Sequence, residues 1–162
     1  MPKPKTRTVD KDAIALLKAD HKKVRGLLSD FEDTSNRATT QREELLQTIE
    51  RELKIHTRIE EEIFYPAFRE AAEKQDDKRL FYEALEEHHV VDLVLAELPQ
   101  VDPAADTFEA KITVLRELIE HHVEEEQDEI FPMAEKKLGK ERIAELGEQL
   151  EERSDALEAR AA

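Results

Sequence analysis

One eleven-residue phrase occurs twice in the chain, 66 residues apart. The first copy is HTRIEEEIFYP, at residues 56–66, and the second is HVEEEQDEIFP, at residues 122–132. Each copy has a histidine, a glutamate four residues later and a proline six residues after that glutamate. Two other histidines, His21 and His88, are 67 residues apart, so the repeat extends to the segments before the two copies. The sequence therefore predicts two similar halves within one domain.

The composition and the spacing of apolar residues both favour helices. Charged residues make up 40% of the chain, and there are only 3 glycines. No run of alternating apolar residues indicates a strand, whereas apolar residues recur at steps of three and four along four long stretches. A shorter stretch with the same spacing follows them near the C-terminal end of the sequence.

Local signals suggest where these helices begin and end. The first helix begins near residue 10, and Thr40 with Glu43 reads as a capping box for the second. We expect a kink at Pro66 and a continuation to about Lys74, because proline lacks the backbone donor of a helical turn. Asp76 or Asp77 can cap the third helix, Asp106 the fourth, and Gly139 suits a helix C-terminus.

These elements predict an all-α fold. Four long helices in two similar hairpins indicate an up-down-up-down four-helix bundle with a pseudo-twofold axis. We assign residues 10–138 to the bundle and 139–162 to an additional C-terminal amphipathic helix. Residues 1–9 are interpreted as a disordered basic tail. The role of the last helix stays open between covering the bundle, forming a dimer and binding a partner.

The charge balance restricts the classes of partner. With 25 basic and 40 acidic residues, the formal net charge is −15. A surface this acidic repels phosphates, so we expect neither nucleic acid nor a membrane surface as a partner. There is no cysteine for a disulfide or a thiolate ligand, and no apolar run long enough to span a bilayer. The N-terminus has no apolar stretch typical of a secretory signal, so a cytoplasmic protein is expected, as a monomer or small homo-oligomer.

The repeated histidines lie on the apolar stripes that should face the interior of the bundle. The two glutamates are four residues after their histidines and so share the same helical face. Carboxylates buried without a partner would each cost several kcal/mol, and a divalent ion would remove that cost. The candidate metal ligands are therefore the members of the two repeats: His21, His56, Glu60, His88, His122 and Glu126.

This set of ligands leaves coordination positions free. Two six-coordinate ions offer roughly twelve positions. The histidines, two bridging carboxylates and a bridging oxo or hydroxo group fill all but about two of them. Such a site can accept O2, peroxide or NO. The ligands suit iron or manganese, and zinc could also occupy the site.

The pattern of histidines followed at four residues by glutamate resembles the hemerythrin-like family, also called the HHE cation-binding domain. The resemblance covers about residues 12–138. It implies a non-haem di-iron centre in which the six residues named above are the ligands and both glutamates bridge the ions. The oxygen carriers of this family have HxxxH in the third helix, where this chain has His88 and Asp92. One histidine fewer favours reactive or sensing chemistry over O2 transport, unless Asp92 fills the vacancy.

The sequence leaves several functions open. A di-iron protein that binds or reacts with O2, peroxide or NO is the leading interpretation, with roles in oxidative or nitrosative stress, and catalase-like peroxide decomposition is the reaction we favour if it is an enzyme. Iron storage is an alternative, although Glu86 and His89 form the only ferritin-like Glu-x-x-His match in the bundle. A bundle stapled by metal for protein interaction is another. His89 and His121 should point away from the site. Tyr65 and Tyr82 could gate the site or hydrogen-bond to it, but packing is the role that we favour for each.

Overall fold

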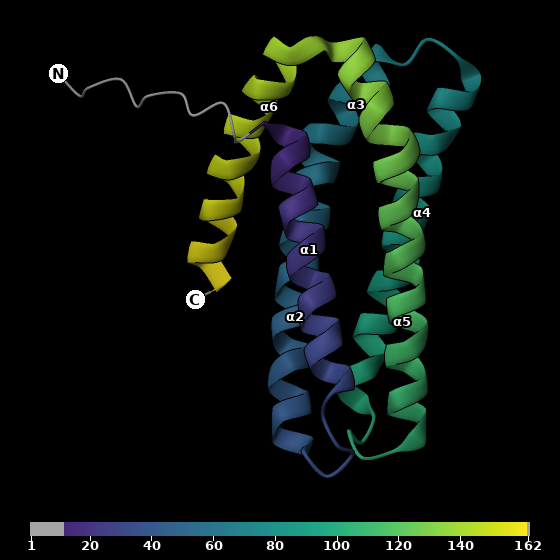
Figure 1. Ribbon diagram of the computed structural model, residues 1–162, viewed down its shortest axis with the longest axis vertical. Coiled ribbons are helices and arrows are strands. Elements are labelled where there is room, and N and C mark those ends of the chain that lie inside the picture. Colours follow the sequence, from purple (N-terminus) through teal and green to yellow (C-terminus); the bar gives the residue numbers. More distant parts are fainter. Residues whose placement is uncertain (1–11, 162) are drawn as a thin grey trace, which may run out of the picture.

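The computed structural model describes residues 12–161, and every regular element in that range is a helix. Four long rods run alternately up and down, side by side (Figure 1). The predicted four-helix bundle is thereby confirmed. Its rods are built on α1 (Ala13–Glu32), α2 (Thr39–Ile59), α4 (Gln75–Glu97) and α5 (Asp106–Glu125). The shorter elements are η1 (Glu60–Phe64), α3 (Tyr65–Ala71), η2 (Leu98–Gln100) and η3 (Glu126–Ile130), and α6 (Phe131–Ala161) ends the chain.

Each copy of the repeated phrase contains one turn of π-helix, η1 in the first copy and η3 in the second. The backbone N–H of Tyr65 bonds to the carbonyl of Glu60, five residues earlier, and Phe131 bonds to Glu126 in the same way. Each π turn ends two residues before the proline of its phrase. The wider turn accommodates a residue that lacks an N–H and crowds the carbonyl four residues before it. The kink expected at Pro66 is therefore a change of winding that begins at Glu60.

Three predicted helix starts differ from the structure. The second helix begins at Thr39, so Thr40 is already inside the first turn and forms no capping box. Lys74 precedes the first residue of α4, and Ala105 precedes that of α5; neither provides a side-chain cap. The segment after Pro66 ends at Ala71, before the expected Lys74.

Asp77 has a different role from the cap that the sequence suggested. It is buried in the first turn of α4, and its carboxylate lies 3.1 Å from the Lys137 ammonium of α6. The aspartate therefore ties α4 to α6.

The C-terminal segment packs back on the first hairpin. At Gly139 the backbone of α6 has φ 76° and ψ 164°, a conformation open to glycine and strained for other residues. Beyond this bend, Ile143, Leu146 and Leu150 are buried in one core cluster with residues of α1 and η1. Arg153 donates from Nε to Glu62 at 2.6 Å, which fixes the far part of α6 to η1.

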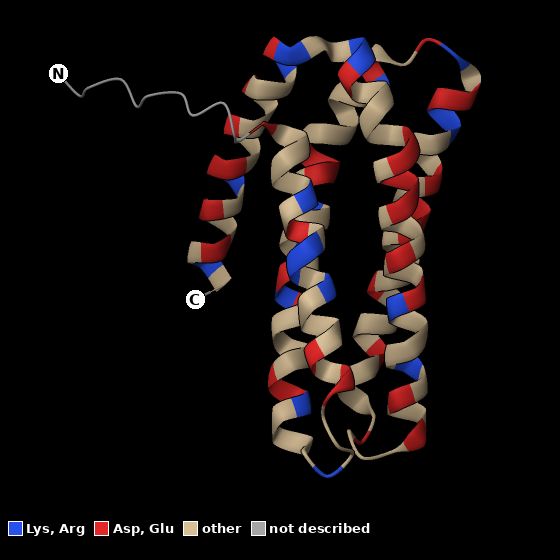
Figure 2. Ribbon diagram, in the orientation of Figure 1, with Lys and Arg blue, Asp and Glu red and all other residues tan. Residues whose placement is uncertain are grey.

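Acidic residues are dense on the upper part of α4 and α5 in Figure 2, whereas α1 carries several basic residues. Within residues 12–161, no helix has both the length and the apolar character that crossing a bilayer requires. The basic tail expected at residues 1–9 lies outside the described residues.

Candidate metal centre

Six side chains from both hairpins converge in the interior, between the two hydrophobic core clusters. The helices α1, α2, α4 and α5 each contribute one imidazole, and η1 and η3 each contribute one carboxylate from their first residue. The two glutamates are completely buried, and none of the four histidines is more than 7% exposed. The structure therefore brings together every residue that the sequence suggested as a metal ligand: His21, His56, Glu60, His88, His122 and Glu126.

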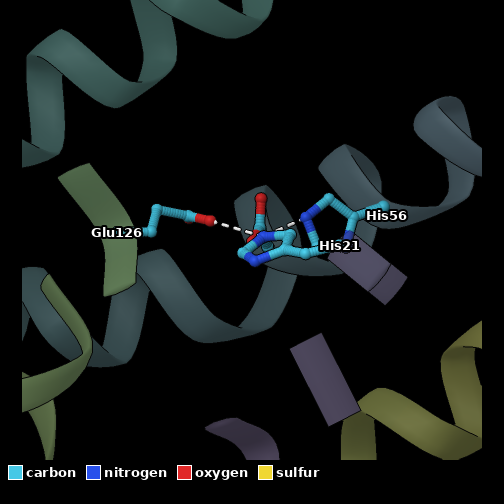
Figure 3. A group of neighbouring side chains, drawn as sticks. His21, His56 and Glu126 are labelled. Atoms are coloured by element: carbon cyan, nitrogen blue, oxygen red, sulfur yellow. Dashed lines mark ion pairs between the residues drawn. The ribbon is translucent and has the colours of Figure 1, made fainter. Parts of the chain in front are cut away.

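Each carboxylate lies close to a histidine of the other hairpin as well as to one of its own. One oxygen of Glu60 lies 3.0 Å from Nε2 of His56, and its other oxygen lies 3.2 Å from Nε2 of His88. Glu126 Oε2 lies 2.9 Å from Nε2 of His21 and 3.5 Å from Nε2 of His122. Figure 3 shows Glu126 reaching towards His21 and His56 from the opposite side of the bundle. Glu60 thus turns one oxygen to a histidine of each hairpin, whereas Glu126 turns the single atom Oε2 to both of its histidines.

The nitrogen and oxygen atoms of these side chains that could bind a metal converge in the interior. The ligand atoms form two groups, and within each group all the atoms lie within 4.8 Å of one another. The first group comprises His21, His56, Glu60 and Glu126, and the second comprises Glu60, His88 and His122. Among residues 12–161, several buried atoms of the site have no hydrogen-bond partner: both ring nitrogens of His21, Nε2 of His56, both oxygens of Glu60 and Oε2 of Glu126. Buried polar atoms are rarely left unpaired. The residues present therefore fit a pair of cations.

Three of the four imidazoles are backed by a carboxylate on the side away from the centre. Nδ1 of His56 lies 3.1 Å from Asp20, Nδ1 of His88 2.8 Å from Glu61, and Nδ1 of His122 2.5 Å from Glu87. This arrangement fixes each ring with Nδ1 outwards and leaves Nε2 for a metal, as is usual for histidine ligands. Nδ1 of His21 has no such partner.

When no ion is bound, the buried carboxylates and imidazoles shift one another's pKa values. Burial lowers the pKa of His56, but Coulombic attraction to Glu60 and the hydrogen bond to Asp20 outweigh it, so the pKa lies well above its usual value. Burial also lowers the pKa of His88, while the close carboxylate of Glu60 and the hydrogen bond to Glu61 raise it to about 9. The pKa of Glu60 is lowered well below its usual value because the neighbouring histidines outweigh its burial.

Tyr65 lies in the site, which corrects our interpretation of it as a packing residue. Its ring is stacked on His88, and its hydroxyl donates to Glu126 Oε1 at 2.6 Å. The hydroxyl also lies 3.3 Å from Nε2 of His88 and 3.5 Å from Nε2 of His122. Burial and the nearby glutamates raise the pKa of this phenol well above its usual value, so it stays protonated and can donate. Its counterpart in the repeat, Phe131, stacks on His21 and has no hydroxyl.

Other candidates from the sequence lie elsewhere. Asp92 is exposed on α4 and does not fill the place of the histidine that the oxygen carriers have. His89 and Glu86 are also exposed, so the ferritin-like pair does not enter the interior. His121 is exposed and lies 3.3 Å from Glu87. Tyr82 is half exposed, and its hydroxyl accepts a hydrogen bond from Arg69.

A small cavity of about 20 Å³ lies against all four site histidines. This volume holds roughly one molecule the size of water. Apart from the histidines and Thr57, its walls are aliphatic: Val24, Leu53, Val91, Ile119 and Val123. The glutamates and Tyr65 are not part of the lining, so the cavity meets the imidazoles on a face away from the carboxylates. Such a space admits a small, weakly polar molecule and excludes a larger one.

Comparison with known proteins agrees with this geometry. The family model described as the hemerythrin HHE cation binding domain matches residues 12–134, which is most of the chain. The chain belongs to the hemerythrin HHE family. A crystal structure of an HHE domain-containing protein from Mycobacterium kansasii, described as an Rv2633c homolog, superposes with a TM-score of 0.80. The two chains are 26% identical, and the match covers 93% of this chain and 89% of the other.

A protein named DNA nickase, from Nostoc sp. (strain PCC 7120 / SAG 25.82 / UTEX 2576), is also similar. It is 25% identical over 116 residues, which are 72% of this chain and 31% of that protein. The matched part of the present HHE chain therefore spans about a third of the length of this relative.

Proposed function

We propose that this HHE domain holds two iron ions and binds or reacts with O2, peroxide or NO. The observation that carries the proposal is the set of buried imidazoles and carboxylates from both hairpins: five of the atoms that could face a metal have no hydrogen-bond partner among residues 12–161. The lack of any cysteine and the presence of imidazoles with carboxylates favour iron or manganese over structural zinc. A pair of such ions, when bound, supplies the electrons that the chemistry of these small molecules requires.

The chain itself provides three conditions for this chemistry. The outer carboxylates Asp20, Glu61 and Glu87 orient the imidazoles, so that Nε2 faces the centre. The Tyr65 hydroxyl holds one oxygen of Glu126 and is the only phenolic donor described within the site. The aliphatic walls of the cavity limit the ligand to a few atoms and keep bulk water away. Peroxide decomposition is the reaction that we favour, and oxidative or nitrosative stress in the cytoplasm is the setting that we propose.

The test is to load the metal-free protein with Fe²⁺, measure iron per chain, and record spectra before and after azide or peroxide. We expect close to two ions per chain, near-ultraviolet absorption and a spectral change with either reagent. His56→Ala should lose iron because it removes a buried ligand, whereas His89→Ala, an exposed histidine on α4, should retain it. The rate of peroxide loss then measures the reaction itself.

The outcomes separate this proposal from its alternative. If the wild-type chain binds no more iron than His56→Ala, the metal centre is wrong. If two ions bind but neither azide nor peroxide changes the spectrum, the ions serve to hold the helices together and the site is closed to small ligands. The name of the Nostoc relative does not lead us to propose DNA cleavage here, because a chain with net charge −15 repels a phosphate backbone.

A further inference from the structure

The pseudo-twofold axis makes the two halves of the metal centre comparable residue by residue. An offset of 66 or 67 relates His21 to His88, His56 to His122 and Glu60 to Glu126. With both glutamates bridging, each position would have two imidazoles and a share of both carboxylates. Tyr65 already separates the positions, because its hydroxyl lies near His88 and His122 and bonds to Glu126 Oε1, whereas its counterpart Phe131 has no hydroxyl. The remaining difference comes from the residues behind the imidazoles.

One pair of outer contacts obeys the symmetry. Asp20 accepts from Nδ1 of His56, and its counterpart Glu87, 67 residues later, accepts from Nδ1 of His122. Both carboxylates come from the residue before a site histidine. These contacts therefore do not distinguish the two positions in kind.

The other pair of outer contacts breaks the symmetry. Glu61 accepts from Nδ1 of His88 at 2.8 Å. The residue 66 positions later is Gln127. Nδ1 of His21, which corresponds to His88, has no hydrogen-bond partner in the described part of the chain. An amide is neutral, so it could not supply the charge of a carboxylate even if its oxygen reached this ring.

This difference should act on the strength of metal binding. A carboxylate that accepts from the far nitrogen of a histidine makes the ring a better ligand, and loss of such a partner typically costs 10–100-fold in metal affinity. The His88/His122 position has two imidazoles backed in this way, and the His21/His56 position has one. Glu61 also adds a negative charge close to the His88/His122 position.

On these grounds, which rest on the metal centre proposed above, we propose that the two positions are unequal and that the pair His88/His122 binds the first ion. Glu61 is a positioning residue for that ion: it acts through His88 and does not itself touch the metal. The pair His21/His56 then takes the second ion with lower affinity.

The experiment follows the rings of the four histidines while metal-free protein is titrated with Zn²⁺. Two-bond ¹⁵N–¹H spectra resolve the ring nitrogens, and assignment uses single His→Gln variants. At one equivalent we expect the signals of His88 and His122 to move first, and those of His21 and His56 to move towards two equivalents. Calorimetry on the same samples should show two steps of different affinity.

A reciprocal exchange provides the decisive variant. Glu61→Gln together with Gln127→Glu keeps the composition and the net charge, and it moves the carboxylate from the residue that contacts His88 to the symmetry-related position in the other half. We expect the order of filling to reverse or the two steps to merge. Glu61→Gln alone should weaken the first step by 10–100-fold. Glu124→Gln, which removes an exposed carboxylate from the end of α5, should change neither step.

The results distinguish this inference from the proposed function. If the wild-type chain binds no Zn²⁺ at the histidines, the metal centre itself is wrong. If two ions bind but all four rings respond together, or His21 and His56 respond first, the centre stands and the inequality is wrong. An exchange variant that binds two ions in the original order would also overturn the role of Glu61.

Discussion

At the scale of single residues, the site is a set of opposite charges that compensate one another inside the bundle. When no ion is bound, protons on the imidazoles supply the positive charge that balances the buried carboxylates. For His88, burial lowers the pKa, but the nearby carboxylates of Glu60 and Glu61 outweigh burial and raise it to about 9. Metal binding must therefore displace protons from the imidazoles.

This coupling predicts that the metal-free protein loses stability at alkaline pH. Because the folded pKa of His88 is about 9 and that of an unfolded histidine is about 6.5, the stabilisation is complete below about pH 6.5 and is lost as the pH rises through about 9. The difference corresponds to on the order of 3 kcal/mol.

Urea unfolding of the metal-free chain at pH 6 and pH 9 measures this loss in the free energy of unfolding. The Zn²⁺-loaded chain is the control: the ion takes the place of the proton, so its stability should not fall in this interval. Equal stability of the metal-free chain at both pH values would contradict the pKa of His88.

The sequence revealed the six converging residues but did not reveal the role of Tyr65. Histidines and glutamates on an apolar stripe are conspicuous because they are costly to bury, whereas a tyrosine on the same stripe is an ordinary core residue. Only coordinates show that the Tyr65 hydroxyl reaches Glu126.

At the scale of elements, the spacing of apolar residues predicted the long helices well and their ends poorly. An apolar stripe is defined by about twenty residues together, so one exception does not hide it. A helix cap depends on a single residue and on where the chain turns. The helix that we expected to be capped by Thr40 therefore begins two residues earlier than such a cap requires, at Thr39. The π turns were missed because they follow no pattern in apolar residues, although the two prolines signalled an irregular winding at these places.

Gly139 and Gly26 give opposite predictions for the same substitution. Gly139 has a positive φ, so Gly139→Ala should lower the free energy of unfolding by about 1–3 kcal/mol. Gly26 is helical and a Cβ there meets no atom within 4 Å, so Gly26→Ala should raise it by about 0.5–1 kcal/mol. Urea unfolding of both variants tests the pair. If Gly139→Ala were as stable as the wild type, α6 would not bend at this residue.

At the scale of the whole molecule, α6 breaks the symmetry of the two hairpins. Its C-terminal part packs on the first hairpin, where Ile59 is completely buried in the same core cluster as Leu146. The counterpart of Ile59 in the second hairpin is Glu125, which is partly exposed and lies with Glu87 and His121. The sequence could not place α6, because its apolar face fits the bundle, a second copy or a partner equally well. The surface around Ile59 decides where α6 packs, because the corresponding place in the second hairpin has Glu125 in place of an apolar residue.

If α6 is an integral part of the fold, truncating its buried side chains should destabilise the whole molecule. Leu146 is 1% exposed and lies in the shared cluster, so Leu146→Ala should cost about 2–5 kcal/mol in the free energy of unfolding. Leu157 is only partly buried near the end of the helix, so Leu157→Ala should cost less.

Far-ultraviolet circular dichroism during urea unfolding measures both values. A single transition that shifts as a whole in Leu146→Ala would show that α6 and the bundle unfold together. Two separate transitions, the first corresponding to α6 alone, would mean that the helix docks on a bundle that is stable without it. In that case Zn²⁺ binding should be the same in Leu146→Ala and in the wild type, because every proposed ligand precedes Gly139 in the sequence.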